Sequence, residues 1–195
     1  MQYKDISQDA TPLYRLKTNE KRVFFMLNRT GVITIELAGH GAEAHIFSFF
    51  IGRNTDKATL KIFQKHLAPK TTSHALIKSV LSDESEVAYE GSIFMNKQAI
   101  QGDASQESRA ILLSPNTKVS LKPTLEILAN DVRCRHAATA GPISQESLFF
   151  AESRGLSKTQ ATKLLIDGFF NDALQKMEKL GVDIVEIKKI LGIRY

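Results

Sequence analysis

Residues 32–51 read VITIELAGHGAEAHIFSFFI, and this stretch decides the class of fold. Ile33, Ile35 and Leu37 alternate with polar residues, which is the period of two expected for a half-buried β-strand. The polar Gly39-His40-Gly41 segment then separates this strand from the apolar run that ends the stretch. Short strands divided by tight turns are therefore the basic unit of this sequence.

The same pattern continues to about residue 143. Further apolar segments lie at residues 44–51, 59–67, 74–81, 86–95, 109–113 and 125–129, with polar, Gly- or Pro-containing breaks at residues 52–54, 69–71, 83–85 and 114–116. Many short strands at this spacing indicate a β-sandwich, a barrel or a β-solenoid. The residues alone leave these three architectures open, because the sequence has no strict repeat and no hexapeptide pattern.

From Ser144 onward the apolar period becomes helical. Ser144 is placed to cap a short helix that ends near Gly155, and Ser157 has the spacing of a capping box with Gln160. We expect Asp183 to cap a last helix. The apolar face of the middle helix consists of Ala161, Leu164, Leu165, Phe169, Leu174 and Met177.

Length and charge limit the class of protein. The chain has 195 residues, 43% of them hydrophobic, which is enough for a sizeable core. We divide it into an extended arm at residues 1–20, a β body at residues 21–143 and a C-terminal helical domain at residues 144–195. The net charge of +5 comes from basic residues dispersed among 21 acids, so we expect no nucleic-acid partner. The apolar runs are shorter than the roughly 20 residues that span a bilayer, so we expect a cytoplasmic protein without membrane contact.

One short segment carries the candidate chemistry. Cys134, the only cysteine, and His136 are two residues apart, so in an extended strand both side chains leave the same face. A thiolate and an imidazole suit a soft metal or an iron–sulfur centre. Such a centre needs more ligands than these two, so the pair predicts half of a site that another subunit completes. The alternative is that both residues only pack or form hydrogen bonds.

The other candidate motifs point to no enzyme. His40, His45, His66 and His74 lack the spacing of a helical zinc motif, so we interpret them as ordinary strand or turn residues. The sequence has no phosphate-binding loop, no dinucleotide fingerprint and no serine nucleophile elbow. His136 lies too close to Cys134 along a strand to act as a convincing base for a cysteine nucleophile.

Several segments, in order along the chain, resemble the SufB/SufD family of iron–sulfur cluster assembly proteins. LEILANDVRCRHAATAG at residues 125–141 is similar to the SufD signature LEI-ADDVKCSHGATVG. Other similar elements are ESLFF (146–150), SRGL (153–156), ATKLLIDGF (161–169), HLAPKTTS (66–73), KSVL (78–81), YEG (89–91) and ILLSP (111–115). The likeness extends over roughly residues 32–180, which is most of the chain.

The resemblance implies a mainly β protein with a right-handed parallel β-helix core and a small C-terminal α-helical domain. It also implies a scaffold that is not an enzyme. A SufB-like subunit would pair with the β-helix, and a SufC-like ABC ATPase would dock on the C-terminal helices. His136 matches the family's interface histidine and Cys134 its neighbouring cysteine. Together they would contribute to a transient iron–sulfur cluster that the isolated chain does not hold.

Three departures from the family pattern matter. Ala137 replaces the usual glycine after the histidine, the additional scaffold cysteine of SufB is missing, and the usual N-terminal helical region is not seen. The chain therefore looks closest to SufD, in a short form. Two alternatives remain: a structural or homo-oligomeric β-helix that binds no metal, and a zinc or iron enzyme that joins two Cys-x-His pairs across a homodimer.

Overall fold

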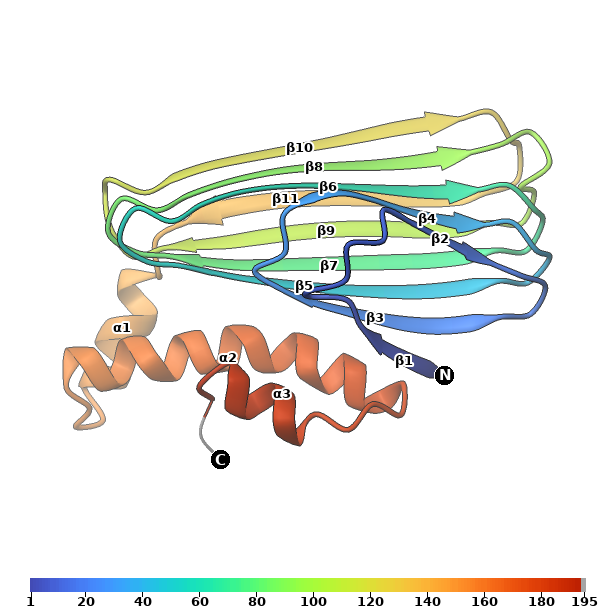
Figure 1. Cartoon of the computed structure of the whole chain (residues 1–195). Helices are drawn as coiled ribbons and strands as arrows, with labels where there is room; N and C mark the ends of the chain where they lie inside the picture. Colours follow the sequence, from blue (N-terminus) through green and yellow to red (C-terminus); the bar gives the residue numbers. More distant parts are fainter. Residues whose placement is uncertain (194–195) are drawn as a thin grey trace.

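Parallel strands wind into a β-solenoid, which is followed by three helices (Figure 1). A computed structural model describes residues 1–193. Every strand pairing recorded among these residues is parallel. The structure thus confirms the β-helix with a C-terminal helical part and selects the solenoid from the three architectures that the residues had left open.

The strands form two sheets that enclose the core between them. Sheet A contains, in order, β1 (Gln2–Asp5), β3 (Lys21–Leu27), β5 (Glu43–Gly52), β7 (Thr72–Leu81), β9 (Asp103–Leu112) and β11 (Arg133–Gly141). Sheet B contains, in order, β10 (Lys118–Ile127), β8 (Glu86–Met95), β6 (Lys57–His66), β4 (Gly31–Leu37) and β2 (Leu13–Leu16). The chain alternates between the sheets, so each coil adds one strand to each.

Successive coils stack in register. Glu43 of β5 pairs with Thr72 of β7, which pairs with Asp103 of β9, and Asp103 pairs in turn with Arg133 of β11. One coil therefore takes roughly 30 residues, a length typical of solenoid repeats. Because side chains alternate between the faces of a strand, this register also aligns the inward-pointing residues of neighbouring coils.

The turns at one end of the solenoid stack as well. Gly41, Lys70 and Gln101 hold corresponding positions in successive coils and have φ angles of 67°, 55° and 57°. Each N–H in this series donates to a carbonyl of the next coil at 2.7–3.2 Å. Left-handed backbone is uncommon for lysine and glutamine, and the hydrogen bonds to the next coil stabilise it here.

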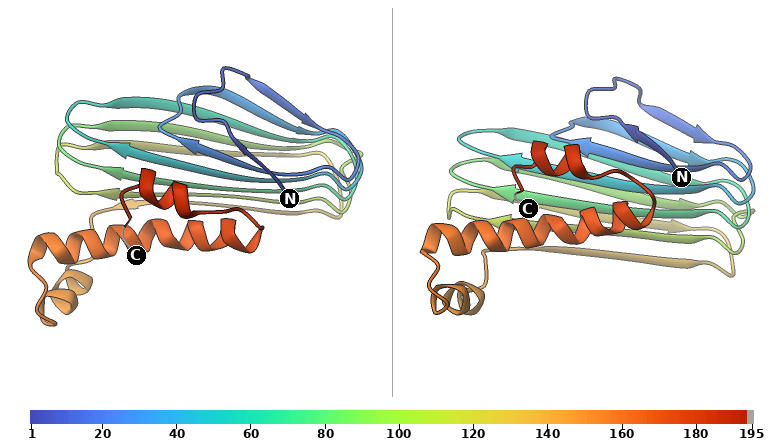
Figure 2. Two further views of the ribbon diagram at one scale, coloured as in Figure 1. Left: turned by 60° about the horizontal axis from the view of Figure 1, so that its bottom comes forward. Right: turned by 90° about the horizontal axis from the view of Figure 1, so that it is seen from below.

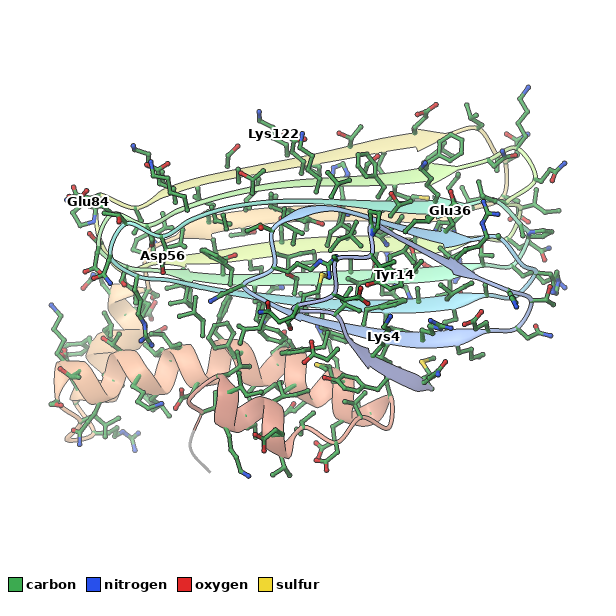
Figure 3. All side chains as sticks on the ribbon, in the orientation of Figure 1. Lys4, Tyr14, Glu36, Asp56, Glu84 and Lys122 are labelled. Carbon is green, nitrogen blue, oxygen red and sulfur yellow. The ribbon has the colours of Figure 1, made fainter. Side chains whose placement is uncertain are left out.

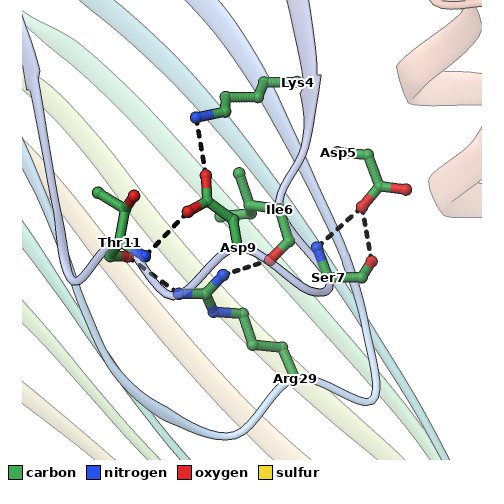
Figure 4. Close-up of polar contacts among 7 residues, drawn as sticks. All are labelled: Lys4, Asp5, Ile6, Ser7, Asp9, Thr11 and Arg29. Atoms are coloured by element: carbon green, nitrogen blue, oxygen red, sulfur yellow. Dashed lines mark hydrogen bonds and ion pairs between the residues drawn. The ribbon is translucent and has the colours of Figure 1, made fainter.

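The first twenty residues are part of the solenoid rather than a separate arm. β1 and β2 pair with β3 and β4 and so form the first coil. Buried Arg29 stabilises the loop between β1 and β2 (Figure 4). Its guanidinium donates to the carbonyl of Ile6 and to the carbonyl of Thr11, the latter at 3.0 Å. An ion pair of 2.8 Å between Lys4 and Asp9 closes the same loop.

The core between the sheets consists of alternating apolar residues. Ile33, Ile35 and Leu37 are fully buried, as the period of two predicts. Tyr14 of the first coil lies in this interior and packs against Phe24 with ring centroids 5.1 Å apart, whereas Lys122 projects from β10 away from the body (Figure 3).

The three helices are α1 (Gln145–Glu152), α2 (Lys158–Lys179) and α3 (Val185–Ile190). Two of them, α2 and α3, cover the outer face of sheet A, and α1 packs against α2. α2 runs along the sheet and α3 lies beside it, as the view from below shows (Figure 2). Phe170 of α2 meets Phe49 of β5 edge-on at 5.6 Å, and Leu174, Met177 and Ile187 belong to the same buried cluster.

Two of the three helix caps predicted from the sequence are confirmed. Ser144 caps α1, and Ser157 forms the predicted capping box with Gln160 at the start of α2. The predicted cap of the last helix is wrong: α3 has Ile184 at its N-cap position, without a side-chain bond. Asp183 instead accepts the N–H of Val185 at 3.0 Å, which stabilises the turn before the helix.

An ion pair with a buried ammonium joins α2 to the solenoid. Lys78 of β7 is 1% exposed, and its ammonium lies 2.8 Å from the carboxylate of Asp172. The same ammonium donates to the carbonyl of Phe169 and lies 4.5 Å from the centre of that residue's ring. This contact sets the position of the middle of α2 on sheet A.

None of the three helices within residues 1–193 combines the length and the apolar character of a membrane-crossing helix.

Candidate functional site

The candidate residues lie on the last coil of the solenoid. β10 and β11 are the terminal strands of their sheets, and each pairs on one edge only, with β8 and β9 respectively. The layer beyond this coil is not covered by any other part of residues 1–193. We call this uncovered layer the open end of the solenoid.

Cys134 and His136 both point into the solenoid at its open end. In the register, Cys134 pairs with Ala104 and His136 with Gln106, and both partners are buried between the sheets. The two candidate ligands therefore leave the same face of β11, as their spacing predicts. Cys134 is half-buried and His136 is exposed, so a molecule that covers the open end reaches both.

The surroundings of Cys134 favour the neutral thiol. Its side chain packs against a buried cluster that includes Ile93 and Ala104. Burial raises the pKa of the Cys134 thiol, and the carboxylate of Asp103 adds to this shift. A bound cation is the ordinary means of stabilising the thiolate that serves as a metal ligand.

Apolar side chains surround the pair at the open end. The strand β10 lies in register over the buried inward residues of β8. Its own inward residues are therefore Val119, Leu121, Pro123, Leu125 and Ile127. Ile127 is 43% exposed. Exposed apolar side chains on unpaired edge strands favour association with another chain.

The remaining histidines are distributed over the body. His40 is exposed in a turn. His45 and His74 are neighbours on the outer face of sheet A, with ring centroids 5.3 Å apart, and they bond to Glu43 and Ser105 at 2.9 and 2.7 Å.

His66 is fully buried between the sheets, with its ring nitrogens 2.8 Å from the Thr71 hydroxyl and 2.7 Å from that of Ser73. Burial lowers the pKa of His66 to about 3, and His74 adds to this shift.

A polar interior beneath the site was not foreseen from the sequence. Gln64, Ser73 and Gln106 are buried between the sheets and linked by hydrogen bonds of 2.6 and 2.9 Å. Gln106 lies directly beneath His136 in the register. In the sequence, polar and charged residues alternate along residues 106–109 (QESR), which resembles an exposed strand.

The donor set of this chain is incomplete for a metal centre. Among residues 1–193, no group of three or more His, Cys, Asp or Glu side chains is arranged to hold a metal ion. Cys134 and His136 are chemically suited to iron or an iron–sulfur cluster, but they offer two ligands where four are usual. The geometry therefore fits a centre shared with a second chain.

Comparison with known proteins identifies the family. The model of the SUF system FeS cluster assembly SufBD core domain matches residues 27–169. This match covers the solenoid from the end of β3, together with α1 and the first half of α2. The chain belongs to the SufBD family. It has the core domain that defines the family, including the last coil with Cys134 and His136.

Individual SufBD relatives include both main branches. The iron–sulfur cluster assembly protein SufD of Escherichia coli is 27% identical over 147 residues, 75% of this chain and 35% of the relative. The iron–sulfur cluster assembly protein SufB of Bacillus subtilis is 29% identical over 136 residues, 68% of this chain and 29% of the relative. The chloroplastic protein ABCI7 of Arabidopsis thaliana is 30% identical over 135 residues, which are 69% of this chain and 28% of the relative. The chain thus spans about a third of the length of these relatives.

Proposed function

We propose that this chain is a SufD-like scaffold subunit of an iron–sulfur cluster assembly complex and catalyses no reaction by itself. The observation that carries the proposal is that Cys134 and His136 point together into the open end of the solenoid. An iron–sulfur cluster is the cargo of such a complex, and this pair would supply part of its ligands during assembly. The partner across the open end would supply the rest.

The partner is a SufB-like subunit that pairs through the β-helix. Its pairing surface is the layer of β10 and β11, where exposed Ile127 is an inward residue of the same coil as the candidate ligands. A partner whose strands continue both sheets would satisfy the free backbone groups of these edges and bury the apolar layer. This arrangement also brings a second set of ligands to the same place.

The helical part offers a separate docking surface for a SufC-like ABC ATPase. Phe149 and Phe150 of α1 are 72% and 61% exposed, whereas Leu148 and Ala151 of the same helix pack toward α2. Two adjacent exposed aromatic residues are typical anchors of a protein interface. They lie on the helix that follows β11 directly, at one end of the body (Figure 1).

The assignment to the SufD rather than the SufB branch rests on the number of cysteines in the chain. The relatives named SufD and SufB are about equally similar to this chain, so identity does not separate them. The chain has one cysteine in total, and that cysteine lies on the last coil. A subunit that holds a nascent cluster on its own solenoid needs a further thiol, which this chain lacks. We place the protein in the reducing cytoplasm, where its thiol would stay free.

Co-purification tests the proposal. The chain is expressed with a SufB-like and a SufC-like protein, and we expect all three to elute together in size-exclusion chromatography. Ile127→Asp should remove the SufB-like subunit, because it places a charge in the apolar layer. Val32→Asp is the matched control, since Val32 is also an exposed β-branched residue of sheet B, at 48%, but lies far from the last coil. Failure of the wild type to co-elute contradicts the proposal.

A structural, homo-oligomeric β-helix is the second candidate, because the same apolar layer also suits a second copy of the chain. Light scattering of the isolated wild type and of Ile127→Asp distinguishes the two. A dimer that this substitution abolishes, together with no binding of the SufB-like protein, favours the homo-oligomer. Metal analysis of that dimer then tests a Cys2His2 site between copies.

A further inference from the structure

A chain of hydrogen bonds runs through the interior of the solenoid toward the candidate site. It begins at His66 in β6, continues through Ser73 and Gln64, and reaches Gln106 in β9. All four side chains are at most 2% exposed. The next inward position above Gln106 belongs to His136, so the polar chain leads to the candidate ligand.

One carbonyl fixes the direction of the bonds at the upper end of the chain. The side-chain nitrogen of Gln64 lies 3.3 Å from the backbone carbonyl of Ser105, and a carbonyl only accepts hydrogen bonds. The nitrogen of Gln64 therefore faces Ser105, and its oxygen faces Gln106. Since this oxygen accepts at 2.9 Å, the group of Gln106 that meets it must be the amide nitrogen.

The same reasoning extends to the lower end. The Thr71 hydroxyl donates its hydrogen to the carbonyl of Ala68 at 3.0 Å, so it accepts from Nδ1 of His66, which carries the ring hydrogen. Nε2 of His66 therefore accepts from the Ser73 hydroxyl, which itself accepts from the nitrogen of Gln64 at 2.6 Å. Every donor and acceptor in this direction has a partner.

The upper end of the chain leaves one acceptor without a partner. Oε1 of Gln106 is buried and forms no hydrogen bond in the structure. The amide is held against the opposite sheet at Gly91, where an added Cβ would lie 2.0 Å from Oε1. A buried acceptor without a partner costs free energy, so a donor within reach is expected to turn toward it.

We propose that Gln106 is a positioning residue for His136: its Oε1 accepts a hydrogen bond from a ring N–H of His136. Neighbouring strands are about 4.8 Å apart, and these two residues are in-register neighbours on the same inward face. His136 is exposed and lies on the last coil, so its ring is free to rotate toward the amide.

This bond selects one tautomer of the imidazole. The nitrogen that faces Gln106 carries the hydrogen, and the other nitrogen, which is able to bind a metal, faces the open end. Second-sphere hydrogen bonds of this kind orient histidine ligands in metal sites. The role in a shared centre rests on the proposed function, whereas the hydrogen bond itself is a property of the isolated chain.

Nuclear magnetic resonance of the isolated full chain tests the bond without any partner or metal. The chain is labelled with 15N in its histidines, and ring spectra are recorded at about pH 9, where imidazoles are neutral. His136→Gln assigns the signals. In the wild type we expect the two well-separated nitrogen shifts of a single tautomer. In Gln106→Met, which keeps the length of the side chain but removes the acceptor, the two shifts should converge toward the average of two exchanging tautomers.

Ser108→Ala is the matched control, because Ser108 is a buried inward residue of the same strand that pairs with Ala138 rather than with His136. This variant should keep the wild-type pattern. Gly91→Ala displaces the Gln106 amide from the opposite side and should act like Gln106→Met. Averaged shifts in the wild type, or unchanged shifts in both Gln106→Met and Gly91→Ala, overturn the proposal. Neither result bears on co-purification, so the two tests fail independently.

Discussion

The ion pair between Lys78 and Asp172 makes an asymmetric prediction about stability. The ammonium is almost fully buried, whereas the side chain of Asp172 is 45% exposed. Burial lowers the pKa of Lys78, and Asp172 partly offsets that shift. Removing the carboxylate therefore leaves a buried charge without its counter-ion, whereas removing the ammonium leaves a carboxylate that water can solvate.

The two substitutions should differ in magnitude. Breaking a fully buried pair from one side costs about 3–5 kcal/mol. We expect about 2 kcal/mol for Asp172→Asn, because the carboxylate is partly hydrated and the Phe169 carbonyl still accepts from Lys78. Lys78→Met keeps the apolar stem in place and removes the charge, so it should cost about 1 kcal/mol or less. In a chain of this length, 1 kcal/mol corresponds to about 2–4 °C in Tm.

Thermal and urea unfolding of the single variants and of the double variant measures these costs. The double variant should be less destabilised than the sum of the two single variants, since Asp172→Asn no longer leaves a buried charge unpaired when Lys78 is methionine. The reasoning is refuted if Lys78→Met costs as much as Asp172→Asn, or if the two costs add.

Two further predictions concern the buried histidine and the exposed aromatic residues. The pKa of His66 is lowered from the ordinary range to about 3, so its contribution to stability is complete above about pH 6.5 and is lost as the pH falls toward 3. The urea midpoint should therefore drop between about pH 6.5 and 5, and less so in His66→Gln; equal slopes in both proteins would contradict this. Replacing Phe149 and Phe150 together by serine should abolish pull-down of the SufC-like protein and leave Tm within about 2 °C of the wild type. The control is Ile190→Ser, which changes an exposed apolar residue of α3 and should keep the binding. Retained binding in the double serine variant would place the ATPase elsewhere.

The sequence predicted those parts of the fold that depend on local patterns. The alternation at Ile33, Ile35 and Leu37 indicated a strand with one buried face, and the residues are buried as expected. The capping box of Ser157 and Gln160 also depends only on near neighbours. The choice of a solenoid came from the resemblance to a family, because apolar alternation alone does not say how strands close around a core.

Strand boundaries were predicted less well where the interior is polar. The sequence indicated a strand at residues 109–113, whereas β9 extends from Asp103 to Leu112. The part of β9 that was missed contains Gln106 and Ser108, which are buried in the core, and the amide nitrogen of Gln106 donates there to Gln64 of another coil. A polar side chain in a buried position gives no apolar period, so a pattern based on hydrophobicity misses it. The strands β1 and β2 were missed for a different reason, since four residues each are too few to show a clear period.

The candidate site was partly predictable. The i, i+2 spacing placed Cys134 and His136 on one face of a strand, and the register shows that this face is the inward one. That β11 is the last strand of its sheet depends on the whole topology, which no local pattern encodes. Buried Lys78 likewise became explicable only once α2 lay across β7, because its counter-ion is 94 residues away along the chain.

Anaerobic reconstitution with iron and sulfide tests the shared centre most directly. We expect no cluster absorbance from the isolated chain, a stoichiometric signal from its complex with a SufB-like subunit, and a much smaller signal when His136→Ala replaces the wild type in that complex. A stable cluster on the isolated chain, or an equal yield from the complex with His136→Ala, would contradict the claim that Cys134 and His136 form half of a site completed by a partner.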